Sequence, residues 1–80
     1  MLMAELQTLV VDDREINLTQ VLKLVNWAEN GGQAKALIAD GRVRVNGEVE
    51  TRKRRQMAIG DRVQCDDGPT LVLARAPETP

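Results

Sequence analysis

The residues of this chain best suited to chemistry are arginines and lysines gathered near its middle. Arg52-Lys53-Arg54-Arg55 is an unbroken run of cations, and Arg42 and Arg44 precede it on a segment where basic and apolar residues alternate. A guanidinium can donate two parallel hydrogen bonds to one phosphate, whereas an ammonium acts as a point charge. The pattern therefore predicts a surface that binds a polyanion, and we favour RNA.

These cations also have plainer interpretations, which stay open. The run at residues 52–55 is what an exposed loop that only keeps a protein soluble would contain. Arg42 and Arg44 could pair with Glu48 and Glu50 across a hairpin, an interaction that contributes little stability at a surface.

Missing residue types restrict the function classes. The chain has no His, Ser, Tyr or Phe, so it can form neither a Ser-His-Asp triad nor a zinc site of His and Cys ligands. It also lacks a glycine-rich phosphate loop. We expect a protein that is not an enzyme, with no cofactor, no metal and no small-molecule substrate.

The composition also bears on location. Cys65 is the single cysteine, which excludes an internal disulfide and fits a reducing cytosol. Residues 1–6 lack the cationic and apolar segments of a secretory signal, and no apolar stretch is long enough to cross a bilayer. The length of 80 residues suits one small domain, and we expect a cytoplasmic monomer without a membrane partner.

Charge is distributed unevenly along the chain. Residues 31–64 hold eight cations and four carboxylates. Residues 1–30 hold two cations and five carboxylates, and residues 65–80 hold one cation and three carboxylates. The net charge of −1 therefore hides a basic centre between acidic ends, and the local potential matters more than the sum for binding a polyanion.

Two short helices and a small sheet must position these cations. Asn17 is a suitable N-cap for a first helix that ends near residues 27–28. Its spacing predicts a buried stripe of Leu18, Val21, Leu22 and Val25. Asn30 would cap a second helix, with Gln33 reaching back as in a capping box, and Gly41 would end it.

The other segments predict strands joined by tight turns, at residues 6–11, 42–45, 62–65 and 70–74. Asn46-Gly47 is a strong signal for a hairpin turn. We favour a three-residue loop that pairs Val45 with Val49, because it keeps the valines of both strands on the buried face. Met57 and Ile59 would return to the core.

The elements together predict an α+β fold in which two short helices pack on a small, mainly antiparallel sheet. We divide the chain into an N-terminal segment with a short strand (residues 1–15), a main domain (residues 16–75) and a disordered tail (residues 76–80). Trp27 is the only aromatic residue and could either join the core or stack on a base. Without further aromatic residues the chain has no platform for single strands, so structured RNA is favoured.

Residues 16–63 resemble the RNA-binding domain named after ribosomal protein S-four, also called the αL motif. The resemblance rests on two helices followed by Val45-Asn46-Gly47 and Ile59-Gly60-Asp61 at this spacing. Gly32-Gln33-Ala34-Lys35 and Arg52-Lys53-Arg54 are similar to small stand-alone bacterial members, the YbcJ and YaaA types. The resemblance implies a cytosolic RNA-binding protein that acts in ribosome assembly or ribosome-associated quality control.

Two positions depart from the pattern of family members that bind ribosomal RNA. Asn17 stands where an Arg often starts the first helix, and Asn30-Gly31-Gly32 stands where a Ser-Arg-Ser run often opens the second. Lys35 does occupy a basic position of the pattern. We therefore expect RNA contacts from the cationic centre and from the glycines whose N–H groups can hold a phosphate: Lys35, Arg42, Arg44, Arg52, Lys53, Arg54, Arg55, Gly31 and Gly32.

The predicted function is the non-catalytic binding of structured RNA, ribosomal RNA or the ribosome in particular. One alternative is a protein-interaction module that docks a ribosomal or RNA-processing partner. Another is a DNA-binding helix-turn-helix, which would need base-reading side chains where Gly31 and Gly32 stand. The glycines could also serve only as a tight turn between the helices.

Overall fold

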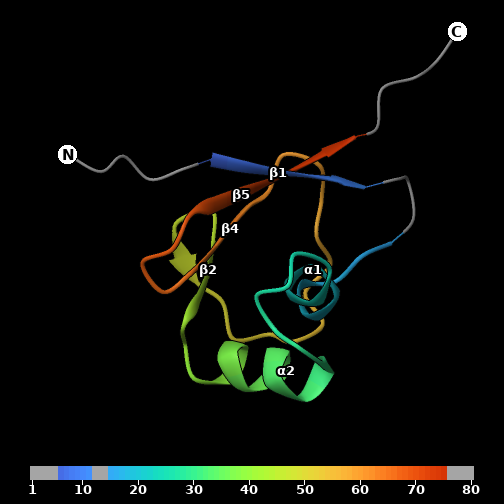
Figure 1. Cartoon of the computed structure of the whole chain (residues 1–80). Coiled ribbons are helices and arrows are strands. Elements are labelled where there is room, and N and C mark those ends of the chain that lie inside the picture. The colour runs from blue at the N-terminus through green and yellow to red at the C-terminus, as the bar shows by residue number, and fades with distance from the viewer. Residues whose placement is uncertain (1–5, 12–14, 76–80) are drawn as a thin grey trace, which may run out of the picture.

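The computed structural model describes residues 6–11 and 15–75, and it contains two helices and five strands. The helices are α1 (Leu18–Leu24) and α2 (Gly31–Ala39). The strands are β1 (Leu6–Val11), β2 (Val43–Val45), β3 (Glu48–Val49), β4 (Arg62–Cys65) and β5 (Thr70–Arg75). Both helices lie on the same side of one sheet, so the fold is α+β as expected (Figure 1). The expected tail at residues 76–80 lies outside the described residues.

The sheet is mixed, with strand order β1-β5-β4-β2-β3. Three of its four pairings are antiparallel, and β1 pairs with β5 in parallel from Leu6 opposite Thr70 to Val11 opposite Arg75. The strand predicted at residues 6–11 is confirmed. Its pairing joins the segment before residue 15 to the same sheet as the rest of the described chain.

The core fills the space between the sheet and the helices. Strands β2, β4 and β5 each turn alternate residues inward, and the helices contribute their predicted apolar stripes. Its largest fully buried side chains are Leu18, Leu22, Ile38, Leu71, Leu73, Val21, Val43 and Val63. Burying one such side chain contributes roughly 1.5–3 kcal/mol, so this cluster holds the layers together.

Helix α1 begins as predicted and ends earlier than predicted. Asn17 accepts a hydrogen bond from the Gln20 N–H, and the Gln20 side chain accepts one from the Asn17 N–H, which completes a capping box. The helix ends at Leu24 because Asn26 adopts a left-handed conformation (φ 61°). This turns the chain so that the Trp27 N–H donates to the Leu22 carbonyl (3.0 Å) and the Trp27 side chain packs, partly buried, against the core.

The predicted three-residue hairpin loop is wrong. Val45 pairs with Glu48 and Arg44 with Val49, so Asn46 and Gly47 alone form the turn. Both have left-handed backbones (φ 53° and 87°), as a two-residue turn of type I′ requires. Val49 consequently lies on the outer face, where it is 53% exposed.

Of the two residues after the hairpin that were predicted to join the core, only one does so. Met57 is 9% exposed and belongs to the core, whereas Ile59 is 46% exposed and does not. Ile59 lies at the tip of a turn in which the Asp61 N–H donates to the Ala58 carbonyl (3.0 Å). A residue at such a tip points away from the sheet, and the alternation expected of a strand does not apply there.

Candidate functional site

The basic loop, residues 51–56, is fixed against the start of helix α1. The Leu18 N–H donates to the Arg55 carbonyl (3.0 Å), and the Met57 N–H donates to the Ile16 carbonyl (2.8 Å). The hydroxyl of Thr19, which is 8% exposed, donates to the Lys53 carbonyl (2.7 Å). These bonds hold the loop backbone in one position, so its side chains project from a defined platform.

Glu50 organises the arginines at both ends of the basic loop. Its Oε2 accepts bonds from the Arg52 N–H and from Arg52 Nε, both at 3.0 Å, and its Oε1 lies 2.9 Å from Nη2 of Arg52 and from Nε of Arg55. The Glu50 side chain is 12% exposed. The hydrogen bonds from Arg52, with the charge of Arg55, lower the pKa of Glu50 to about 2. Glu50 therefore stays ionised and orients both guanidinium groups.

Arg55 is part of the fold rather than of the free surface. Its side chain is 24% exposed and bridges two carboxylates, with Nη1 lying 3.3 Å from Oδ2 of Asp61 in addition to the Glu50 contact. Burial raises the pKa of Asp61, but bonds from the Ala58 N–H, from Asn46 and from Arg55 outweigh that effect and lower it overall. The ion pairs tie the basic loop to the segment that precedes β4.

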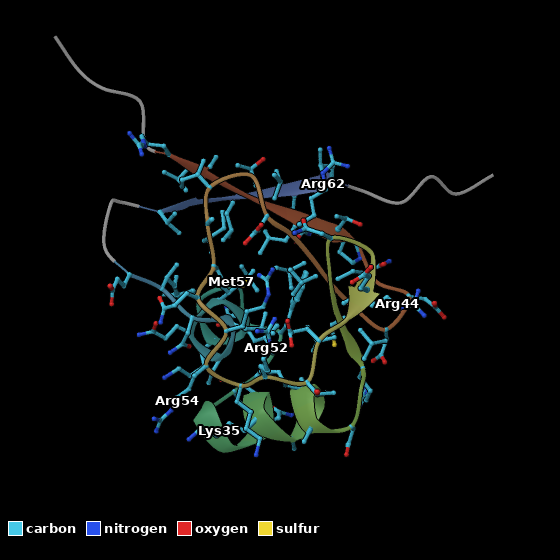
Figure 2. All side chains as sticks on the ribbon, turned by 180° about the vertical axis from the view of Figure 1, so that it is seen from behind. Lys35, Arg44, Arg52, Arg54, Met57 and Arg62 are labelled. Atoms are coloured by element: carbon cyan, nitrogen blue, oxygen red, sulfur yellow. The ribbon has the colours of Figure 1, made fainter. Side chains whose placement is uncertain are left out.

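Lys53 and Arg54 are the exposed cations of the basic loop. Within residues 6–11 and 15–75, neither side chain has an ion-pair or hydrogen-bond partner. Lys35 is likewise exposed on α2, and Lys35 and Arg54 extend toward the same end of the molecule (Figure 2). Arg54 also lines an open hollow of about 510 Å³ beside Arg52, which is 74% exposed at its side chain.

The first turn of α2 begins with two glycines, so the N–H groups of residues 31 and 32 are not covered by side chains of their own. The first helical bond runs from the Ala34 N–H to the Asn30 carbonyl (3.0 Å), so the N–H groups of Gly31 and Gly32 have no acceptor in the helix. A Cβ atom at Gly31 would meet nothing within 4 Å, whereas one at Gly32 would lie 3.3 Å from Oδ1 of the Asn30 cap. Asn30 caps as predicted, but the Gln33 side chain accepts from the N–H of Glu29 instead of Asn30.

The two arginines before the hairpin turn have different surroundings. Arg42 pairs with Asp66, with Nε 3.0 Å from Oδ1, and this hydrogen bond lowers the pKa of Asp66. Arg44 is exposed on β2 and has no such partner in the described part of the chain. The alternative in which both pair with Glu48 and Glu50 is wrong, because Glu50 is occupied by Arg52 and Arg55.

Three residues that position or extend this surface were not among the predicted ones. Thr19 fixes the basic loop, and Asn46 accepts the Arg62 N–H (2.9 Å) while donating to Asp61 (3.1 Å). Arg62 is exposed on β4, beside the buried Val63. Its alternation with Val63 and Cys65 is the signal that could have identified it as an outward cation.

Other kinds of site find little support in the described residues. Over residues 6–11 and 15–75, no group of three His, Cys, Asp or Glu side chains could hold a metal ion. In the same ranges, neither helix has the length and apolar character needed to cross a bilayer. The exposed cations remain the most distinctive chemistry of this surface.

Comparison with known proteins gives relatives over most of the chain. The chain is 50% identical over 59 residues to the protein named "Putative RNA-binding protein YbcJ" of Escherichia coli (strain K12), covering 74% of this chain and 84% of that protein. It is 36% identical over 56 residues to "Probable ribosome maturation protein RlbA" of Bacillus subtilis (strain 168), covering 70% of this chain and 79% of that protein. The solution structure of E. coli YbcJ superposes with a TM-score of 0.67 and 36% identity, covering 92% of this chain and 94% of that chain. That structure is described as revealing an αL motif involved in RNA binding.

The family model of the S4 domain matches residues 9–73, which include every described helix and at least part of every strand. The match agrees with the fold, since the two capped helices, the Asn46-Gly47 turn and the basic loop all fall inside it. This chain belongs to the S4 domain family.

Proposed function

We propose that this protein binds structured RNA without catalysing a reaction. The observation that carries the proposal is the basic loop, whose backbone is bonded to α1 while Lys53 and Arg54 project without partners among the described residues. A fixed backbone with free cations spares part of the entropy that ordering a loop on RNA would otherwise cost. The family membership and the names of the relatives support the same partner.

The contact surface that we propose joins the basic loop to α2. Lys53 and Arg54 would contact phosphates directly, and Lys35 and the N–H groups of Gly31 and Gly32 would extend the contact along α2. Arg52 can add a contact while Glu50 holds it, and Arg55 positions the loop through its two carboxylates. Recognition on such a surface would depend on the shape and phosphates of the RNA.

We propose that the RNA bound by this protein is ribosomal RNA and that binding serves ribosome maturation. The support is the similarity to a B. subtilis protein named for ribosome maturation. In this proposal the protein acts as a monomer in the cytoplasm. Crosslinking in cells, followed by sequencing of the bound RNA, should recover ribosomal RNA above its share of total RNA.

Fluorescence anisotropy with a labelled RNA stem-loop tests the RNA proposal directly. The double variant Lys53→Gln with Arg54→Gln should weaken binding and lower the slope of log affinity against log salt by about 2, since each phosphate contact contributes about 1. Lys23→Gln is the control, because Lys23 lies on α1 beside a different hollow. Unchanged affinity of the double variant at low salt would refute the proposed contact.

A competition experiment separates this function from its rivals. Unlabelled duplex DNA of the same stem sequence should compete more weakly than RNA, because A-form geometry and the 2′-hydroxyl groups distinguish the two. Equal competition by duplex DNA and RNA would favour a DNA-binding helix-turn-helix. A protein-interaction module would be favoured if the wild type binds no RNA and its protein partners stay bound after nuclease treatment.

A further inference from the structure

The outer face of the sheet carries two arginines outside the proposed loop and α2 surface. Val43, Val45 and Val63 point into the core, so alternation turns Arg44 of β2 and Arg62 of β4 to the opposite face. Neither guanidinium has an ion-pair or hydrogen-bond partner within residues 6–11 and 15–75. In Figure 2 they lie away from the end that carries Lys35 and Arg54.

The backbone holds the two arginines close together. Arg44 is opposite Gln64 in the β2–β4 register, which makes Arg62 its diagonal neighbour, with Cβ atoms about 7 Å apart in such an arrangement. Asn46 fixes the Arg62 backbone from both sides, accepting its N–H (2.9 Å) and donating its own N–H to the Arg62 carbonyl (2.8 Å). Only the side chains must be ordered when a ligand binds.

The surroundings of the pair are complementary to an anion. Arg44, Arg62, Gln64 and Thr70 line an open hollow of about 430 Å³, and none of the described residues that line it is acidic. The nearby carboxylate of Asp61 is directed instead toward Ala58, Asn46 and Arg55. Two free guanidinium groups beside the polar side chains of Gln64 and Thr70 suit phosphate groups better than an apolar ligand.

We propose that this Arg44–Arg62 hollow is a second contact for the phosphate backbone of the RNA that the basic loop binds. The inference rests on the proposed function and extends it, because the RNA then touches two parts of the protein. Two linked contacts strengthen binding only if one RNA molecule can span both. A stem-loop with single-stranded extensions should therefore use the hollow, whereas the isolated stem-loop should not.

The test uses Arg44→Gln combined with Arg62→Gln in the full chain, with both RNA probes in anisotropy titrations. For the extended stem-loop we expect affinity to fall about tenfold and the salt slope to fall by about 2. For the isolated stem-loop we expect less than a twofold change. Arg44→Lys with Arg62→Lys, which keeps both charges, should retain the wild-type salt slope.

Lys23→Glu is the matched control for net charge, because it changes the charge by the same amount beside a different hollow. The inference is overturned if the arginine variant binds the extended probe as Lys23→Glu does, while the Lys53 and Arg54 variant still loses affinity. That result leaves the proposed function standing. If only the arginine variant loses affinity, the hollow binds RNA without the basic loop, and both the loop contact and the inference of a second contact to the same RNA are overturned. Absence of wild-type binding to both probes overturns both.

Discussion

Adjacent arginines of the basic loop have different physical environments. Arg54 is exposed and projects freely, whereas Arg55 lies between the carboxylates of Glu50 and Asp61, whose side chains are only 12% and 17% exposed. Removing Arg55 leaves two poorly hydrated carboxylates with fewer donors, and that is costly. Removing Arg54 disturbs no described contact. The two substitutions should therefore separate stability from binding.

We expect Arg55→Gln to lower the free energy of unfolding by about 1–3 kcal/mol. Arg54→Gln should change it by less than about 0.5 kcal/mol but should weaken RNA binding, because it removes an exposed cation. Urea denaturation and anisotropy measure the two effects. Equal loss of stability in both variants would show that Arg55 is not held as described.

The pKa of Glu50 makes stability depend on acidity. A carboxylate whose pKa is about 2 in the folded protein, below its ordinary value of 4.5, favours the folded state at higher pH. That contribution is complete above pH 4.5 and is lost as the pH falls toward 2. Glu50→Gln should flatten the decline of the unfolding free energy across this window, and Asp61 and Asp66 should keep a residual slope. An unchanged profile would contradict the role of Glu50.

At the scale of elements, the start of α1 both begins a helix and positions the basic loop. Thr19 joins the two through one buried hydroxyl, which donates to a carbonyl 34 residues away in the sequence. Because residues 51–56 include no apolar side chain, the position of the loop depends on such bonds. A substitution in α1 should therefore disturb the loop, although α1 contributes none of the loop's charged side chains.

Thr19→Val keeps the shape of the side chain and removes the hydroxyl. It should lower the free energy of unfolding by about 1 kcal/mol and raise amide exchange in the basic loop, because the Lys53 carbonyl loses its donor. RNA affinity should fall as well. The exposed Thr51→Val is the control within the loop. If both variants exchange alike, the Thr19 bond does not hold the loop.

Local signals in the sequence were enough to predict the helix N-caps, the first strand and the outward direction of Arg44, because each depends on neighbours within a few residues. Asn17 and Asn30 cap as expected, and Gly41 ends α2 with a positive φ of 74°. The Asn46-Gly47 signal is also local and favours the two-residue turn that the structure has, so the wrong loop came from giving the burial of Val49 more weight. The ion pairs of Glu50 with Arg52 and Arg55 depend on how the loop between them folds, which spacing alone does not give. Asn46 is held by Asp61 and Arg62 from across the sheet, and that tertiary clamp outweighs the burial of Val49.

At the scale of the whole molecule, one core joins every layer. Leu22 of α1 is fully buried among residues of both helices and the sheet, whereas Leu24 on the same helix is 59% exposed. Trp27 packs against this cluster and can report on it by fluorescence. A domain with a single core of this kind is expected to unfold in one cooperative transition.

Leu22→Ala should therefore lower the free energy of unfolding by about 3 kcal/mol, with fluorescence and circular dichroism transitions that shift together. Leu24→Ala should change it by less than about 0.5 kcal/mol, since the side chain is mostly in water already. Urea titrations with both probes measure this. Transitions that separate in Leu22→Ala would show that the helices and the sheet unfold independently.

The parallel pairing of β1 with β5 has a consequence for synthesis on the ribosome. Strand β1 precedes every other described element, yet its partner β5 follows all of them, so β1 leaves the ribosome long before it can be paired. Its sequence, Leu-Gln-Thr-Leu-Val-Val, is uncharged and rich in strand-forming residues. Until residues 70–75 have themselves left the ribosome, β1 stays unpaired on the nascent chain, where a segment of this kind is prone to pair with other chains.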